Sequence, residues 1–112
     1  MQKFDSSIDS YIIELTNSCK GGKGVPDIVT EVPNIFKTLQ GLIKDKDIST
    51  KNRLLVFACI GYFFIPDDLY PEEELGQIGY IDDILLSLTI FKEIMSSPIG
   101  YNALKRNWCL GL

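Results

Sequence analysis

Residues 53–65 read RLLVFACIGYFFI, residues 66–74 read PDDLYPEEE and residues 79–95 read GYIDDILLSLTIFKEIM. The first and third pieces are apolar runs, and the second is an acidic turn that contains two prolines. Proline lacks the backbone N–H that a continuing helix needs, so Pro66 ends the first run and the chain reverses. Two apolar helices joined by this reversal therefore decide the fold.

Apolar residues elsewhere in the chain recur at three and four residue intervals, which is the spacing of one helical face. The expected helices are Phe4–Cys19, about Pro33–Lys44 after a short piece from Pro26, Lys51–Ile65, about Tyr80–Met95, and a last helix that begins after Ser97. No stretch alternates with period two for long enough to propose a strand. The sequence predicts an all-α fold, a compact bundle of about five helices in a single domain over residues 1–112.

The third helix is apolar on nearly all sides after Arg53, so we expect it to be the central, buried helix. Ser49 or Thr50 is its expected N-cap. Gly61, with Ala58 one turn earlier, predicts a face of small residues where another helix approaches closely. The longest uninterrupted apolar run, Leu54–Ile65, has 12 residues. A helix needs about 20 residues to cross a bilayer, so this run is too short to span one.

Charge is unevenly distributed along the chain. Residues 67–83 carry seven acids and no Lys or Arg, while the remainder carries 8 acids and 11 bases. The formal charge of −4 is therefore −7 in this acidic segment and +3 elsewhere. Such a local negative charge favours cations or basic partners, and clustered bases for binding nucleic acid are missing.

Residue usage disfavours several kinds of site. The chain has no histidine, and its cysteines, Cys19, Cys59 and Cys109, are far apart and odd in number. A zinc site, a histidine-based triad and a disulfide framework are therefore disfavoured. The N-terminal residues lack the apolar run of a secretory signal, so we expect a cytoplasmic protein. The apolar C-terminal tail from Trp108 is expected to dock on the bundle; an exposed tail, contacting a partner or membrane, is the alternative.

The sequence from Gly61 to Glu72, followed by Gly79 to Asp83, resembles the YkvA-like family, a domain of unknown function numbered 1232. The matching positions are Pro66, Asp68, Leu69, Pro71 and Glu72, then Gly79, Ile81, Asp82 and Asp83. The resemblance covers about Pro33 to Met95. It implies a small helical domain with no established activity, and some members look membrane-associated. Asp67 and the pair Glu73 and Glu74 depart from the family pattern and make this loop more polar.

The acids have two interpretations. In the first they are structural, because Asp82 and Asp83 lie in the first turn of a helix, where each stabilises the helix dipole by roughly 0.3–1 kcal/mol. Asp68 would similarly accept backbone N–H groups in its turn. In the second, Asp68 and Glu72 face Asp82 or Asp83, and these four carboxylates hold a hard cation such as Mg²⁺ or Ca²⁺. Saturable thermal stabilisation by either ion that Asp82→Asn abolishes would support the metal site, and no shift would remove it.

The pattern favours a non-catalytic interaction or scaffold module whose acidic segment contacts a basic protein partner. No catalytic residue is predicted, since paired carboxylates stand without a histidine or a nucleophile motif. The alternatives are a metal-binding acidic-site protein, with enzymatic activity left open, and a peripheral membrane protein, which the net negative charge disfavours. The sequence leaves the partner's identity and the oligomeric state open.

Overall fold

The computed structural model describes residues 10–14, 16–17, 19, 27–64 and 81–111, and this part of the chain contains helices and turns but no strand. Residues 10–14 and 16–17 are helical. The further elements are a 3-10 helix η1 (Asp27–Glu31) and the α-helices α2 (Val32–Lys44), α3 (Thr50–Phe64), α5 (Ile81–Ile94) and α6 (Pro98–Asn107). The predicted all-α fold is confirmed, and each of the five expected helices has a described counterpart.

Serine side chains cap the starts of two helices. The backbone N–H of Asn52 donates to Ser49 Oγ at 3.1 Å, so Ser49 caps α3. Ser97 caps α6 in the same way, accepting from Gly100 N–H at 3.1 Å, and Pro98 occupies the first turn. These caps satisfy N–H groups that have no partner within the helix.

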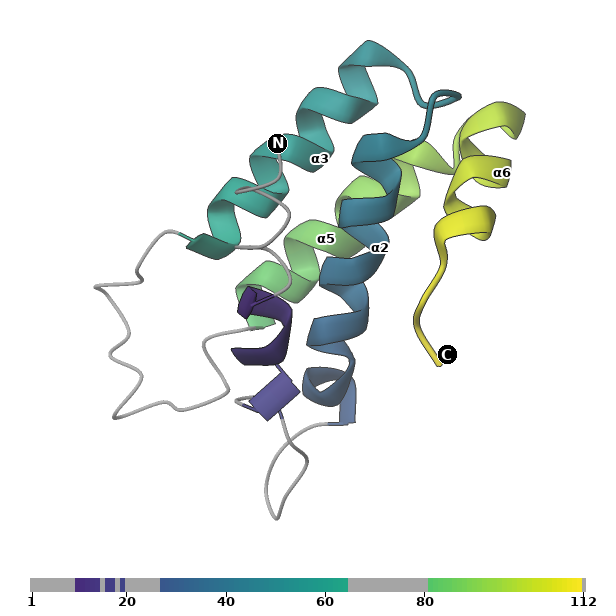
Figure 1. Ribbon diagram of the computed structural model, residues 1–112. Coiled ribbons are helices and arrows are strands. Elements are labelled where there is room, and N and C mark those ends of the chain that lie inside the picture. The colour runs from purple at the N-terminus through teal and green to yellow at the C-terminus, as the bar shows by residue number, and fades with distance from the viewer. Residues whose placement is uncertain (1–9, 15, 18, 20–26, 65–80, 112) are drawn as a thin grey trace.

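The helix α2 is the central element of the described bundle. It packs against α3, α5, α6 and η1, and Figure 1 shows α3 and α6 on opposite sides of it. Its buried residues cover a wide arc of the helix: Val32, Pro33, Ile35, Phe36, Thr38, Leu39 and Leu42. Charged and polar side chains such as Lys37 and Gln40 occupy what remains of its circumference.

The prediction that α3 is the central helix was wrong. Its inner side is buried through Val56, Cys59, Ile60 and Phe63, but Leu54 and Phe57 are exposed on the outer side. Because α3 is apolar all round, its sequence does not indicate which side faces the core. The broad apolar arc of α2 contacts more neighbours, and that decides which helix is central.

An aromatic cluster fixes the junction between α2, α3 and the N-terminal helical residues. Phe36 is fully buried and meets Tyr11 and Phe63 edge-on, at ring-centroid distances of 5.1 Å and 5.4 Å. The Tyr11 hydroxyl donates to the Phe63 carbonyl oxygen at 3.0 Å. Apolar contact and one hydrogen bond thus hold three segments together.

The C-terminal tail lies along the bundle, as predicted. Cys109 N–H donates to the buried Thr38 hydroxyl at 3.1 Å, and Gly111 N–H donates to Glu31 Oε2 at 3.2 Å. Leu110 is buried, and the Trp108 ring meets Phe91 edge-on at 5.7 Å. In the described part of the chain, no helix has both the length and the apolar character needed to span a bilayer.

Candidate protein-contact face on helix α3

The outer side of α3 is apolar, and among the described residues its large side chains are exposed. Leu54 is 65% exposed and Phe57 59% exposed, and Ala58 and Gly61 are also exposed. These four residues fall at i, i+3, i+4 and i+7, which is one face of a helix. We call Leu54, Phe57, Ala58 and Gly61 the outer face of α3.

Among the described helices, the predicted close approach of another helix at Gly61 was wrong. A Cβ atom built on Gly61 would meet no atom within 4 Å. A glycine in the interior of an exposed helix costs about 1 kcal/mol relative to alanine. Within the described part of the chain, no packing contact offsets that cost, and we call the open space at Gly61 the notch.

The outer face is a potential source of binding free energy. Covering one side chain such as leucine or phenylalanine contributes roughly 1.5–3 kcal/mol when its whole surface leaves water. Folding does not realise this contribution at Leu54 and Phe57. Clustered apolar residues left exposed in this way are typical of a surface that contacts another molecule.

The inner side of α3 pairs with α5 through a polar contact in the core. Cys59 Sγ lies 3.4 Å from Ser87 Oγ, and the Ser87 hydroxyl donates to the Asp83 carbonyl oxygen at 2.7 Å. Because that bond uses the only hydroxyl proton, the Cys59 thiol is the donor to Ser87. Burial raises the pKa of the Cys59 thiol, so this cysteine stays protonated and serves packing.

An ion pair at the surface shows how α3 and α5 are oriented. Lys51 Nζ lies 3.1 Å from Glu93 Oε1, which joins the start of α3 to the end of α5. Together with the Cys59–Ser87 contact halfway along, this makes the two helices antiparallel. Ser87 and Glu93 mark the side of α5 that faces α3. The exposed leucines of α5, Leu85 and Leu88, lie on other sides of that helix and belong to a separate surface.

The structure describes only part of the predicted metal site. Asp82 is exposed and Asp83 half-buried in the first turn of α5, as predicted, whereas Asp68 and Glu72 lie outside the described residues. Within the described ranges, no group of three or more metal-ligating side chains comes together. The site of Asp68, Glu72, Asp82 and Asp83, with Mg²⁺ or Ca²⁺, remains a prediction.

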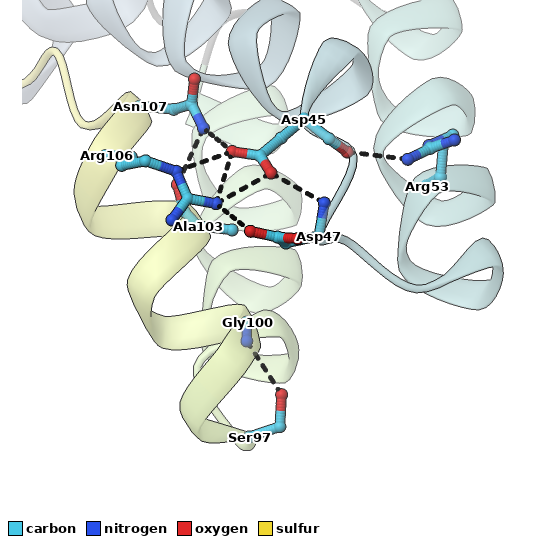
Figure 2. Close-up of polar contacts among 8 residues, drawn as sticks. All are labelled: Asp45, Asp47, Arg53, Ser97, Gly100, Ala103, Arg106 and Asn107. Carbon is cyan, nitrogen blue, oxygen red and sulfur yellow. Dashed lines mark hydrogen bonds and ion pairs between the residues drawn. The ribbon is translucent and has the colours of Figure 1, made fainter.

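A second polar cluster, centred on Asp45, was not found from the sequence. Arg106 Nη2 donates to Asp45 Oδ1 at 2.9 Å and to Oδ2 at 3.0 Å, and also to Asp47 Oδ2 at 3.0 Å. Asn107 Nδ2 donates to the same Asp45 carboxylate at 2.9 Å, and Arg53 donates to the Asp45 carbonyl oxygen at 2.7 Å. Figure 2 shows these contacts converging on Asp45 from α6 and α3.

This cluster has a structural role, because it connects the turn after α2 to α6. We call it the Asp45 joint. The Asp45 side chain is only 9% exposed, and the surface hollow of about 440 Å³ beside it is lined by Asp45, Lys46, Asp47 and Arg106. Arg106 is paired with both carboxylates, so one positive charge is shared between two negative ones. Since 61 residues separate Asp45 from Arg106, local spacing gave no signal for the pair, and the sequence showed only a charged turn.

Arg106→Gln is expected to weaken this joint in a pH-dependent way. The Arg106 hydrogen bonds, partly offset by desolvation and aided by the Asp47 N–H, hold the pKa of Asp45 at about 2 instead of 3.8. A depressed pKa stabilises the fold above the ordinary value, and this stabilisation is lost as the pH falls from 3.8 towards about 2. Arg106→Gln should therefore raise the Asp45 pKa in an NMR titration and lower stability most at neutral pH.

The matched control for this prediction is Lys105→Gln, which removes the neighbouring exposed charge and should leave the Asp45 titration where it is. If Arg106→Gln left the Asp45 pKa at about 2, the assignment of the shift to Arg106 would be wrong.

Comparison with known proteins places the outer face of α3 in a recognised region. The family model described as "Protein of unknown function (DUF1232)" matches residues 52–88. A relative from Methanothermobacter thermautotrophicus, "Uncharacterized protein ORF9", is 32% identical over 82 residues, covering 73% of this chain and 56% of the relative. The chain thus spans little more than half the length of that relative. No solved structure matches this chain. The family resemblance is confirmed, over a shorter range than the expected 33–95.

Proposed function

From the premise that the chain belongs to the DUF1232 family through residues 52–88, we propose that it is a helical protein-interaction module. Its contact surface is the outer face of α3 together with the acidic segment 67–83. The observation that carries this proposal is the exposure of Leu54 and Phe57 on a face where Gly61 has no neighbour.

The extent of the family match supports this assignment. Residues 52–88 include the whole outer face of α3 and all seven acids of segment 67–83. The central helix α2 and the Asp45 joint's partners on α6 lie outside the match. The family region is therefore the part of the chain that combines uncovered apolar surface with concentrated negative charge.

Two of the three cysteines are unsuited to nucleophilic catalysis. Burial raises the pKa of Cys19 to about 11 and also raises that of Cys59, so neither thiol provides a thiolate nucleophile near neutral pH. The chain contains no histidine to act as a base beside them.

A partner that fits the contact surface would present an apolar patch beside basic residues, because opposite charges steer and align association.

Site-specific photo-crosslinking tests the proposal. A photoreactive phenylalanine analogue at position 57 should form a covalent adduct with another protein molecule in the cells that produce the chain. The control is the same analogue at Tyr101, an aromatic residue of α6 that is similarly exposed, at 49%, and lies outside the family match. Replacing Glu72, Glu73 and Glu74 with glutamine should lower the yield at position 57.

The adduct yields at positions 57 and 101 together test the proposed function. Adducts there, and few or none at position 101, would support a contact surface on α3. Equal adduct yields at both positions, or no protein adduct at position 57, would contradict the proposed function.

A further inference from the structure

One end of the described bundle is basic. It consists of the turn between α2 and α3, the first turn of α3, the end of α5 and helix α6, in the upper part of Figure 1. Segments 44–53 and 92–106 carry seven bases and three acids, whereas the other described residues carry one base and five acids. Ion pairs between α3 and α5 and within the Asp45 joint hold the two segments together. We call segments 44–53 and 92–106 the basic end.

Helix dipoles account for only part of this charge sorting. Lys92 and Lys105 lie in the last turns of α5 and α6, where a positive charge stabilises the helix. Lys51 and Arg53, in contrast, lie in the first turn of α3, where a positive charge opposes the dipole. Lys46 lies in a turn outside any helix. The basic end is therefore more positive than the stability of its helices explains.

Three lysines of the basic end keep their charge exposed. Lys46, Lys92 and Lys105 are exposed and form no ion pair with an acid in the described part of the chain. Charges that no neighbouring acid compensates create a positive potential in the solvent around them. The basic end therefore attracts an anionic partner.

An exposed apolar turn lies at the same end, where α5 passes into α6. Met95 is 47% exposed and Ile99 64% exposed, and Pro98 between them is also exposed. The Ser96 hydroxyl donates to the Glu93 carbonyl oxygen at 2.7 Å and fixes the backbone of the turn. We call Met95, Pro98 and Ile99 the apolar turn. Folding leaves its side chains in water, next to the bases in the last turn of α5.

We infer that the basic end binds the surface of an anionic lipid bilayer, with the apolar turn entering the headgroup region. Lysines attract anionic headgroups, and apolar side chains among them gain free energy by leaving water at the boundary with the acyl chains. This surface is separate from the outer face of α3, so the inference does not rest on the proposed function.

The shape and lining of the basic end favour a bilayer over an acidic protein. A protein partner anchors best through side chains that fill apolar pockets. The surface hollow at this end is lined instead by charged residues, Asp45, Lys46, Asp47 and Arg106. Lipids need no pocket, because they rearrange around apolar side chains that enter from the protein.

The net negative charge of the chain does not act at this end. The described acids of η1 and of the first turn of α5 lie at the starts of α2 and α5, and the basic end lies where both helices finish. The 13 residues of α2 correspond to about 20 Å. This length is about twice the Debye length at physiological salt, so those acids are largely screened from a surface at the basic end.

Flotation with lipid vesicles tests the inference on the full chain. At about 0.1 M salt, the protein should float with vesicles of phosphatidylcholine and phosphatidylserine, but not with vesicles of phosphatidylcholine alone. Raising the salt to about 1 M should release it, because the Debye length falls from about 10 Å to about 3 Å.

Lysine variants locate the charged part of the contact. Lys92→Gln should lower the partition coefficient about fivefold, and Lys92→Gln/Lys105→Gln roughly 25-fold, because a lysine near an anionic surface contributes about 1 kcal/mol. The control is Lys37→Gln, which removes an exposed base outside the basic end and should leave partitioning unchanged.

An apolar pair of variants locates the inserted part. Ile99→Asn should lower the partition coefficient by about tenfold or more, because an isoleucine side chain no longer leaves water. Leu54→Asn is the matched control, since Leu54 is 65% exposed and Ile99 64% exposed. It lies on the outer face of α3 and should leave partitioning unchanged.

Several results would overturn the inference. The first is a chain that does not float with the anionic vesicles, or floats equally well with phosphatidylcholine alone. The second is a Lys92→Gln/Lys105→Gln variant that binds as the wild type does. The third is an equal loss in Leu54→Asn and Ile99→Asn, which would place the contact outside the basic end. Photo-crosslinking from position 57 tests the proposed function separately, so either proposal can fail alone.

Discussion

Phe36→Ala is expected to lower the free energy of unfolding by about 3–5 kcal/mol. Phe36 has no exposed surface and its ring contacts both Tyr11 and Phe63. Truncation removes the burial of a whole ring and leaves a cavity where three segments meet. Because a small domain is stable by only about 5–15 kcal/mol, this change should be visible as a large shift of the denaturant midpoint.

Phe57→Ala provides the matched comparison, because it removes the same ring from the outer face of α3. Measured at low protein concentration, it should change the free energy of unfolding by no more than about 0.5 kcal/mol. Similar losses at positions 36 and 57 would mean that Phe57 is part of the core, and the description of α3 as a helix with an uncovered side would be wrong.

Gly100→Ala is expected to destabilise the protein by about 3 kcal/mol, through overpacking at the start of α6. An added Cβ would collide with the backbone carbonyl oxygen of Ile94 and lie 2.9 Å from Ser97 Oγ. The first of these atoms belongs to the last residue of α5 and the second is the N-cap oxygen of α6. Neither can move without disturbing the junction of the two helices. Thermal or urea denaturation measures the loss.

Gly61→Ala is the control, since it makes the same chemical change where no atom is near. Alanine favours the helix over glycine, so this variant should gain about 0.5–1 kcal/mol. If Gly100→Ala were neutral, the close packing of α6 against the end of α5 would be contradicted. A destabilising Gly61→Ala would show that the notch is filled within the chain.

Features encoded by neighbouring residues could be predicted from the sequence. The start of α3 after Ser49 or Thr50 and the start of α6 after Ser97 were expected, because an N-cap bonds to the backbone within three residues. Of the first two candidates, Ser49 is the cap. The start of the main α-helix α2 near Pro33 followed from that proline, which is tolerated in the first turn of a helix. The docking of the tail at Leu110 followed from its apolar character, although its hydrogen bonds to Thr38 and Glu31 did not.

Features that depend on distant residues could not be predicted. The hydrophobicity of α3 indicated a buried helix, but Leu54 and Phe57 are indistinguishable from core residues in a helix that is apolar on all sides. Asp45 and Arg106 form a tight pair only because the end of α2 lies beside the end of α6. Of the predicted acidic site, Asp82 and Asp83 followed from their place at a helix start, while Asp68 and Glu72 lie outside the described residues.

The central claim is that α3 has an outer face made for contact with another molecule, and filling its notch tests this most directly. Gly61→Leu should raise or maintain the melting temperature, because leucine favours the helix over glycine and no atom lies within 4 Å of the added Cβ. Gly61→Leu should also lower the yield of protein adducts that a photoreactive phenylalanine analogue forms from position 57, because the larger side chain fills the open space at Gly61. An adduct yield that Gly61→Leu leaves unchanged would contradict the contact surface on α3. A lower melting temperature would contradict the open notch itself.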